Sequence, residues 1–424
     1  MPGDYIRITL TYLPAQNVRL AAVDEAVFTS IGDPDHFFAA PINLDASDLT
    51  RTSIPLAVNR AGQVVGRRSA PSPLIRAPFV WMNDVAIELP VPEDYTEGEA
   101  RDISDSGQVV GTFVKATNGY RGFSWRDRNT NGVAESGEIT VFEPLWEKED
   151  GTFGWTSASA VNQHGQVAWV STTSLYERAA YLWDDRDGDA VADDDEIRLL
   201  GRAPFSTPID GVNDVNELGQ VAAYKWEEGF VLGPGTATSL NPDWYITHVS
   251  VAPRAINNSG RVVGAFTKES GETRAFLWED RNHNGNTETG ELRDLGVLDG
   301  YVSSEATAVD GEGRVFGILR RDDGSQVAFR WSDGAMSEWL DPAVFSMSNV
   351  TLKGVSSHGH VFGTASFDGN NHGFILYNAL RVGGPNGNAA IVEFDLSQFL
   401  KYRNRPKLLL QAIPDLNVLY GSAD

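Results

Sequence analysis

The chain has 424 residues and no cysteine, and its 58 acidic against 34 basic side chains give a formal net charge of −24. The lack of cysteine excludes disulfides and thiolate chemistry. The charge argues against nucleic acid or an anionic membrane surface as a partner. No apolar run is long enough for a membrane-spanning helix. We therefore predict a protein with no nucleic-acid partner and no membrane span.

Residues 1–50 precede the regular part of the sequence. The segment Ile6–Tyr12 alternates between apolar and polar residues as a strand does. The stretches that begin at Ala22 and His36 faintly resemble the later repeats. The first residues lack the basic and apolar regions of an export signal, so we expect that any such signal has already been removed. Two interpretations of residues 1–50 stay open: strands that close a ring of repeats, or a divergent blade.

Residues 51–378 contain an internal repeat, the strongest signal in the sequence. The pattern A-x-x-(N/D/S)-x-x-G-(Q/R/H)-V-x-G occurs seven times. Its turn glycines are Gly62, Gly107, Gly165, Gly219, Gly260, Gly313 and Gly359, spaced 41 to 58 residues apart. An apolar run follows each copy and ends in tryptophan in five of them, at Trp81, Trp125, Trp183, Trp278 and Trp331. A residue that recurs at one register usually fills one recurring gap, so we expect these tryptophans to pack between neighbouring units.

Each repeat predicts four short strands, which we call a to d in chain order. The N-x-x-G segment is a turn between strands a and b, because asparagine and glycine tolerate left-handed backbone geometry. The apolar run forms strand c, and a segment such as Leu292–Gly296 forms strand d. Four antiparallel strands in a unit of about 40–50 residues are typical of a propeller blade. We predict an all-β, seven-bladed β-propeller, with six or eight blades as alternatives.

The repeat resembles the HAF-repeat family of predicted extracellular bacterial proteins. The resemblance rests on A-I-N-N-S-G-R-V-V-G from Ala255, on R-A-F-L-W from Arg274, and on the equivalent segments over residues 52–378. It implies a secreted or cell-surface location. It implies no activity, since the family is defined by a motif rather than by a reaction.

Three repeats carry an acidic loop between strands c and d. A calcium loop of the EF-hand type wraps one ion with oxygen ligands at its positions 1, 3, 5, 7, 9 and 12, and the acidic loops have the same spacing. The three predicted sets are Asp127, Asn129, Asn131, Val133, Glu135 and Glu138; Asp185, Asp187, Asp189, Val191, Asp193 and Glu196; and Asp280, Asn282, Asn284, Asn286, Glu288 and Glu291. The first and third loops have glycine at position 6, whereas the second has Ala190. We predict three calcium sites with a structural role, because strands rather than helices flank the loops.

The predicted strand order places the loops on two faces of the propeller. The a–b turns and the acidic c–d loops share one face, which we call the turn face. The b–c and d–a connections share the other, which we call the connector face. Aromatic residues outside the repeat register are candidates for binding a glycan or a protein there: Trp146, Trp155, Trp226, Trp244, Tyr245 and Trp339. The basic pair Arg67 and Arg68 is also expected in a b–c connection, where it could meet an acidic ligand.

The sequence offers no clear catalytic motif. Its seven histidines form no H-E-x-x-H pattern, and there is no G-x-S-x-G nucleophile elbow. Residues 379–424 indicate further strands, which either close the ring or begin another module. Our favoured hypothesis is a secreted or cell-surface binding or scaffold module, stabilised by calcium. The alternatives are a polysaccharide lyase or glycoside hydrolase that uses the connector face, and a subunit of an extracellular assembly or filament that joins through its terminal strands.

Overall fold

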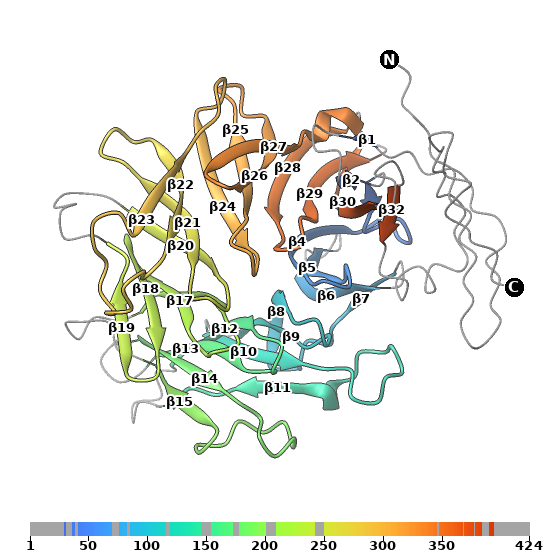
Figure 1. Ribbon diagram of the computed structural model, residues 1–424. Coiled ribbons are helices and arrows are strands. Elements are labelled where there is room, and N and C mark those ends of the chain that lie inside the picture. Colours follow the sequence, from blue (N-terminus) through green and yellow to red (C-terminus); the bar gives the residue numbers. More distant parts are fainter. Residues whose placement is uncertain are drawn as a thin grey trace, which may run out of the picture.

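A computed structural model describes residues 29–30, 36–38, 41–69, 76–82, 85–115, 119–145, 154–172, 178–200, 209–241, 250–345, 347–367, 369–376, 378–383 and 390–393. The protein is a seven-bladed β-propeller with four antiparallel strands in each blade (Figure 1). This confirms the fold predicted from the repeats. In the described part of the chain, no helix is both long and apolar enough to cross a membrane.

The blades follow one another in chain order, and the strands of each blade run from the innermost to the outermost. Blades 1 to 3 are β4 (Thr52–Val58), β5 (Val64–Ser69), β6 (Arg76–Met82) and β7 (Val85–Glu88); β8 (Tyr95–Ile103), β9 (Val109–Lys115), β10 (Gly119–Trp125) and β11 (Ile139–Phe142); and β12 (Thr156–Val161), β13 (Val167–Thr172), β14 (Arg178–Trp183) and β15 (Ile197–Leu199). Blades 4 and 5 are β16 (Gly211–Val215), β17 (Val221–Lys225), β18 (Glu228–Gly233) and β19 (Thr236–Ser239); and β20 (Ser250–Ile256), β21 (Val262–Thr267), β22 (Thr273–Trp278) and β23 (Leu292–Gly296). Blades 6 and 7 are β24 (Ser303–Val309), β25 (Val315–Arg320), β26 (Gln326–Ser332) and β27 (Ala335–Leu340); and β28 (Ser348–Val355), β29 (Val361–Phe367), β30 (Asn370–Leu376) and β3 (Ile42–Asn43).

The ring is closed by β3, which comes from the N-terminal region and pairs with β30 as the outermost strand of blade 7. A further sheet joins the two ends of the chain, in the order β1 (Thr29–Ser30), β2 (His36–Phe38), β31 (Asn378–Gly383) and β32 (Ala390–Glu393). Strands from residues 1–50 and from residues 379–424 are therefore paired with each other, in addition to the strand that closes the ring.

A buried polar cluster, which we call the clasp, fastens this closure. Asp45 follows β3 and is fully buried. Its carboxylate accepts hydrogen bonds from Arg68 Nε at 2.9 Å and from the backbone N–H and hydroxyl of Ser53, both at 2.8 Å. His372 Nδ1 of blade 7 lies 3.2 Å from the same carboxylate. The clasp thus ties blade 1 to blade 7 through one side chain. It also corrects the assignment of Arg68 to an open connection, because Arg68 lies on β5 and is 5% exposed.

Among the described residues, seven hydrophobic clusters lie one between each pair of adjacent blades. The repeated tryptophans belong to them, as expected from their register. Trp125, for example, is 2% exposed and packs with Val65 and Val80 of the preceding blade. In blades 4 and 7, where the tryptophan is absent, Leu232 and Leu376 occupy the same pairing register and are fully buried.

In four of the seven blades, the asparagine of the turn connects the blade to the next. The Asn216 side chain accepts a hydrogen bond from the backbone N–H of Gln220, which fixes its own turn, at 2.9 Å. Its amide Nδ2 donates to the backbone carbonyl of Asn257 in the next blade at 3.0 Å. Asn59, Asn162 and Asn257 make the same bond to the following blade. Asparagine recurs at this position because one amide both accepts within its turn and donates across the interface.

In five blades, the glycine that ends the repeat pattern lies on the second strand, opposite a β-bulge in the innermost strand. A Cβ atom at this glycine would collide with the backbone of the innermost strand. A Cβ atom on Gly317 would lie 2.1 Å from the backbone carbonyl oxygen of Glu305 and 2.6 Å from the Phe329 ring. Gly66, Gly111, Gly264 and Gly363 meet a carbonyl oxygen in the same way, at 2.0 to 2.3 Å. Trp169 and Ala223 stand at this register in blades 3 and 4.

We expect Gly317→Ala to destabilise the protein by about 3 kcal/mol, because the added methyl group must displace backbone atoms. Gly311→Ala in the same blade is the matched control, since its Cβ would meet nothing within 4 Å. The control should change the free energy of unfolding by less than about 0.5 kcal/mol. Urea unfolding measures both variants, and equal stabilities would contradict the described geometry.

Candidate functional site

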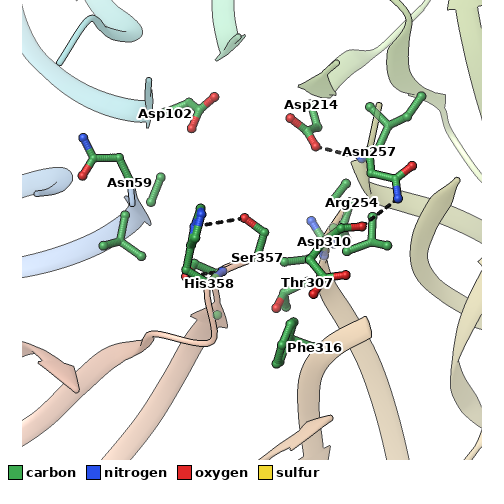
Figure 2. Close-up of a pocket in the computed structure, with 18 of the residues that line it drawn as sticks. Asn59, Asp102, Asp214, Arg254, Asn257, Thr307, Asp310, Phe316, Ser357 and His358 are labelled. Carbon is green, nitrogen blue, oxygen red and sulfur yellow. Dashed lines mark hydrogen bonds between the residues drawn. The ribbon is translucent and has the colours of Figure 1, made fainter. Parts of the chain in front are cut away.

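The innermost strands of all seven blades surround a central channel with a volume of about 1450 Å³ (Figure 2). The sequence alone singled out no candidate residue in this channel. Its lining repeats around the ring because equivalent residues of the seven strands face the same space. The channel therefore brings charged groups from different blades together.

A β-bulge at one register of every innermost strand directs an additional side chain into the channel. The register shifts lie between Pro55 and Ala57 in blade 1 and between Ala100 and Asp102 in blade 2, and the other five blades have the same shift. Bulges bend a strand and change the direction of a side chain. We call the seven bulged residues the bulge ring: Leu56, Arg101, Ser159, Asn213, Arg254, Thr307 and Lys353, all of which line the channel.

The bulge ring contains three cationic residues and no acidic one. Arg254 pairs with Glu305. The Glu305 carboxylate lies 2.9 Å from Arg254 Nε and 2.8 Å from Arg254 Nη2. Arg101 Nη2 lies 2.8 Å from Glu99. Lys353 is exposed to the channel, and no ion pair joins it to another residue of the described chain.

Two carboxylates, Asp102 and Asp214, lie next to the bulge ring and enter the channel from different sides (Figure 2). Asp102 accepts the backbone N–H of Ile103 at 2.8 Å and that of Val161, in the next blade, at 2.9 Å. Asp214 accepts Val215 and Ile256 in the same way, both at 2.8 Å. Each carboxylate therefore joins one blade to the next.

Desolvation raises the pKa of both carboxylates. Burial brings the pKa of Asp102 to about 6 despite its two backbone hydrogen bonds. Burial raises the pKa of Asp214 to about 8, and the negative charge of Asp102 adds to the effect. Both groups thus carry protons near neutral pH more readily than ordinary aspartates. Each carboxylate also accepts two main-chain N–H groups, one of them from the next blade, and so joins the two blades.

The channel has an additional pair of histidines, His358 and His360, at the a–b turn of blade 7. Their rings stack with centroids 6.3 Å apart. His360 is 8% exposed, and burial lowers its pKa to about 3. Its ring bonds to the backbone of Arg60, so it connects blade 7 to blade 1. His358 is the exposed member of the pair, and its Nδ1 lies 3.3 Å from the Ser357 hydroxyl.

The three acidic loops share left-handed backbone geometry at two positions. Positions 4 and 6 have positive φ in each loop: Thr130 and Gly132, Gly188 and Ala190, and His283 and Gly285. Ala190 therefore takes the left-handed conformation that glycine takes in the other two loops, at a cost of about 1 kcal/mol. The same conformation recurs even where the residue disfavours it, so the loop shape is a common feature of the three repeats.

Side-chain contacts within the first and third loops are also the same. In the third loop, Asp280 accepts the backbone N–H groups of Asn284 and Gly285, and Asn284 accepts that of Asn286. Asp127 and Asn131 make the equivalent bonds in the first loop. The glutamate at position 12 is buried in all three loops, with Glu138, Glu196 and Glu291 only 5 to 6% exposed. In the first and third loops, the amide Nδ2 groups at positions 3 and 5 donate to the glutamate at position 9, at 2.7 to 3.5 Å.

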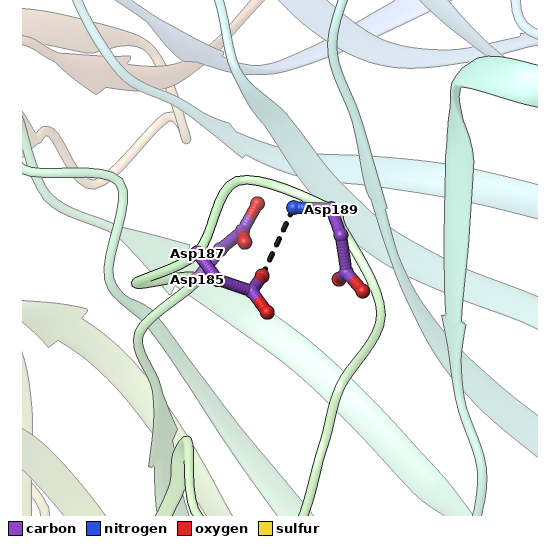
Figure 3. A group of neighbouring side chains, drawn as sticks. All are labelled: Asp185, Asp187 and Asp189. Atoms are coloured by element: carbon purple, nitrogen blue, oxygen red, sulfur yellow. Dashed lines mark hydrogen bonds between the residues drawn. The ribbon is translucent and has the colours of Figure 1, made fainter.

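The second loop carries the highest charge (Figure 3). Asp185, Asp187 and Asp189 place carboxylate oxygens within 4.8 Å of one another. Desolvation raises the pKa of Asp193, and the charges of Asp189 and Asp187 raise it further. Carboxylates at this separation repel one another, and a cation between them would reverse the sign of the interaction.

The acidic loops also bind the preceding blade. Ala190 of the second loop accepts a hydrogen bond from Thr140 Oγ1 on β11 at 2.6 Å. In the third loop, Gly285 accepts one from Thr238 Oγ1 at 2.9 Å, and Thr287 Oγ1 donates to the Ser239 carbonyl at 2.6 Å. The order within these loops is therefore coupled to the packing between blades 2 and 3 and between blades 4 and 5.

The predicted aromatic binding residues have different environments. Trp226 is 81% exposed at the b–c turn of blade 4, and its backbone N–H donates to Asp210 at 2.7 Å. Trp155 is half-buried, and the Arg178 guanidinium lies 4.5 Å from its ring centroid. Trp146, Trp244 and Tyr245 lie outside the described residues.

Trp339 requires a correction. It lies on β27, is 2% exposed, and donates from Nε1 to the Gly359 carbonyl at 3.1 Å. Trp339 packs in the core between blades 6 and 7, because its position on the strand, rather than in a connection, directs it inward. It is therefore not available to bind a ligand.

No protein-family model and no curated protein sequence matches the chain. Solved propellers do resemble it. A Mycobacterium tuberculosis puromycin-hydrolyzing peptidase matches over 90% of this chain and 64% of its own, at 14% identity and a TM-score of 0.42. A prolyl endopeptidase matches over 90% and 60%, at 11% identity and a TM-score of 0.49. An Aleuria aurantia lectin in complex with Fucα1-6GlcNAc matches over 69% and 95%, at 9% identity and a TM-score of 0.30.

The chain thus spans less than two thirds of the length of the two peptidases. At these identities the likeness concerns the fold and not the activity. The class that the structure defines is the seven-bladed β-propeller with a polar central channel.

Proposed function

We propose that the protein is a secreted or cell-surface binding module, a β-propeller stabilised by calcium in three loops of its turn face. The observation that carries this proposal is the common geometry of the three loops. They share ligand spacing, left-handed positions and a buried glutamate at position 12. A loop without a ligand has no evident reason to repeat all three. The proposed secreted or cell-surface location is the one that the resemblance to the HAF-repeat family implies.

The donor set suits calcium, which takes six to eight oxygen ligands. Each loop supplies carboxylate oxygens at positions 1, 9 and 12, carboxylate or amide oxygens at 3 and 5, and a backbone carbonyl at 7. The backbone hydrogen bonds to Glu291 and Asp280 occupy one lone pair of each oxygen concerned. A carboxylate oxygen has a second lone pair, so these bonds are compatible with a bound cation. Calcium in this setting supports blade packing through the contacts with Thr140 and Thr238.

The connector face is then the face that binds the ligand, which we propose to be a glycan. Trp226 supports this, because a large apolar side chain is held exposed on a two-residue turn that is fixed by Asp210. Exposed aromatic rings of this kind stack on sugar rings. The proposal assigns no reaction to the protein.

A glycan array probed in the presence of calcium tests the function. We expect binding to be weakened at least tenfold by Trp226→Ala. Leu218→Ala is the matched control, since Leu218 is also exposed, at 65%, but lies on the a–b turn of the same blade. Equal loss in both variants, or none in either, would contradict a site at Trp226. Release of a shorter sugar product would favour the lyase or hydrolase alternative, and binding of proteins alone would replace the glycan as ligand.

A further inference from the structure

A chain of side-chain contacts joins blade 3 to blade 4 on the connector face. The Arg178 guanidinium lies 4.5 Å from the Trp155 ring centroid, and its Nη1 lies 2.7 Å from Asp210 Oδ1. The other oxygen of that carboxylate, Asp210 Oδ2, accepts the backbone N–H of Trp226 at 2.7 Å. Arg178 and Trp226 thus contact the two oxygens of one carboxylate, which makes them close neighbours.

Asp210 is held by the backbone of both blades, so the position of its carboxylate is defined. Its N–H donates to the Tyr224 carbonyl of blade 4 at 2.9 Å, and the N–H of Ile209 donates to the Arg178 carbonyl of blade 3 at 3.1 Å. The Trp226 turn depends on this carboxylate, because Trp226 has a φ of 51°, which costs a residue other than glycine about 1 kcal/mol. A charge-assisted hydrogen bond to Asp210 offsets that cost.

A comparable arginine in blade 6 has more of its donors engaged. Arg321 lies 4.9 Å from the Tyr301 ring centroid and 3.0 Å from Asp341. It also contacts the Tyr301 hydroxyl at 2.9 Å and the Ser325 hydroxyl at 3.4 Å. The two arginine side chains are about equally exposed, at 34% for Arg178 and 32% for Arg321. Among the described residues, the Arg178 side chain donates only to the carboxylate named above. Since a guanidinium has five N–H groups, the described contacts leave several of them for a ligand.

Trp226 and Arg178 provide complementary contacts for a sugar. The Trp226 ring is 81% exposed, and a sugar ring stacks on such an apolar face. Lys225 Nζ lies 5.7 Å from the Trp226 ring centroid, so the sugar has the opposite face of the ring to stack on. The Arg178 guanidinium supplies N–H donors for hydroxyl oxygens, and its orientation is set by Asp210 and by the Trp155 ring.

We propose that Arg178 is a second ligand-binding residue of the Trp226 site, which blades 3 and 4 therefore form together. The glycan that this site takes presents an apolar ring face to Trp226 and neighbouring hydroxyl groups to the Arg178 guanidinium. Asp210 is the positioning residue, because it fixes both groups and acts through them. The inference rests on the proposed glycan-binding function and adds the residue and the sugar groups that determine its specificity.

The test is a calorimetric titration of the whole calcium-loaded protein with the array oligosaccharide that it binds most tightly, and with the monodeoxy analogues of that sugar. We expect one or two neighbouring deoxy positions to weaken binding about tenfold, because each removes an oxygen that accepts from a charged donor. Arg178→Gln should weaken binding of the unmodified sugar about tenfold for the same reason. In that variant, the sensitive deoxy positions should cost less than about a further twofold, since their partner is gone.

Arg321→Gln is the matched control, because Arg321 has the same kinds of partner in a blade whose tryptophans, Trp331 and Trp339, are buried. It should bind the sugar as the unaltered protein does. Asp210→Asn is a second test variant, since it keeps an acceptor oxygen for the Trp226 N–H but loses the ion pair to Arg178. It should also weaken binding, and it keeps the proposal testable if Arg178→Gln does not fold.

Thermal unfolding of each variant shows whether it is folded. Loss of binding in Trp226→Ala, together with full affinity in Arg178→Gln and Asp210→Asn, would overturn the inference and leave the glycan-binding function standing. Deoxy analogues that weaken binding equally in the unaltered protein and in Arg178→Gln would overturn the inference as well. The absence of binding of any array glycan by the unaltered protein would contradict both the function and the inference.

Discussion

Removal of calcium is expected to lower the thermal stability of the protein markedly. An ion that binds only the folded state stabilises that state by about 2.7 kcal/mol for each site when its concentration is about 100 times its Kd. Three sites make this the largest effect that we predict. The loss should be cooperative, since the second and third loops bond to the outer strands of blades 2 and 4.

The measurement is the unfolding temperature in millimolar calcium and in excess EGTA. Magnesium at the same concentration is a control for ionic strength, because it demands smaller, more regular coordination. The triple variant Glu138→Gln, Glu196→Gln and Glu291→Gln should lose the response to calcium. A melting temperature that is the same in calcium and EGTA would contradict the structural role of the ions.

Breaking the clasp is expected to have the second-largest effect. Asp45→Ala removes the carboxylate that Arg68, Ser53 and His372 share, and it leaves the buried Arg68 guanidinium with Glu88, 3.8 Å away, in place of a carboxylate at 2.9 Å. Breaking a buried ion pair from one side costs about 3–5 kcal/mol. The position magnifies the consequence, because Asp45 fixes the short strand β3 that closes blade 7. The ring should therefore open at this interface before the other blades unfold.

Urea unfolding and amide hydrogen exchange measure this effect together. We expect Asp45→Ala to unfold at lower urea, with early exchange in β3 and β30. Asp48→Ala is the matched control, since Asp48 lies three residues later with its carboxylate facing solvent, where an ion pair contributes little. Its urea midpoint should stay close to that of the unaltered protein. Similar stabilities for the two variants would show that closure depends on the strand pairing alone.

The sequence predicted the fold because its signals are local and repeated. The turn glycines and the tryptophans each recur at one register, and a single unit cannot bury its own apolar face. Trp81, Trp125 and their equivalents occupy the core clusters for this reason. The acidic loops could be found in the same way, because ligand spacing is a property of consecutive residues.

The channel and the clasp could not be predicted, because both depend on contacts between distant segments. Arg101, Arg254 and Lys353 are ordinary polar positions in three strands, and only the bulge turns them toward a common space. One signal was present: each lies immediately before the first residue of the repeat pattern. Asp45 and His372 are 327 residues apart in the chain. The prediction for Trp339 was wrong because strand d is too weakly patterned in blade 6 to separate it from the connection.

The most direct test of the central claim is the number of calcium ions bound per chain. Protein freed of metal, dialysed against a known calcium concentration and measured by atomic emission should contain three equivalents, and the triple glutamate variant should contain none with comparable affinity. A stoichiometry of three with an unchanged propeller fold is the predicted result. A chain that binds no calcium at millimolar concentration would contradict the account, because the three loops would then share their geometry without a common ligand.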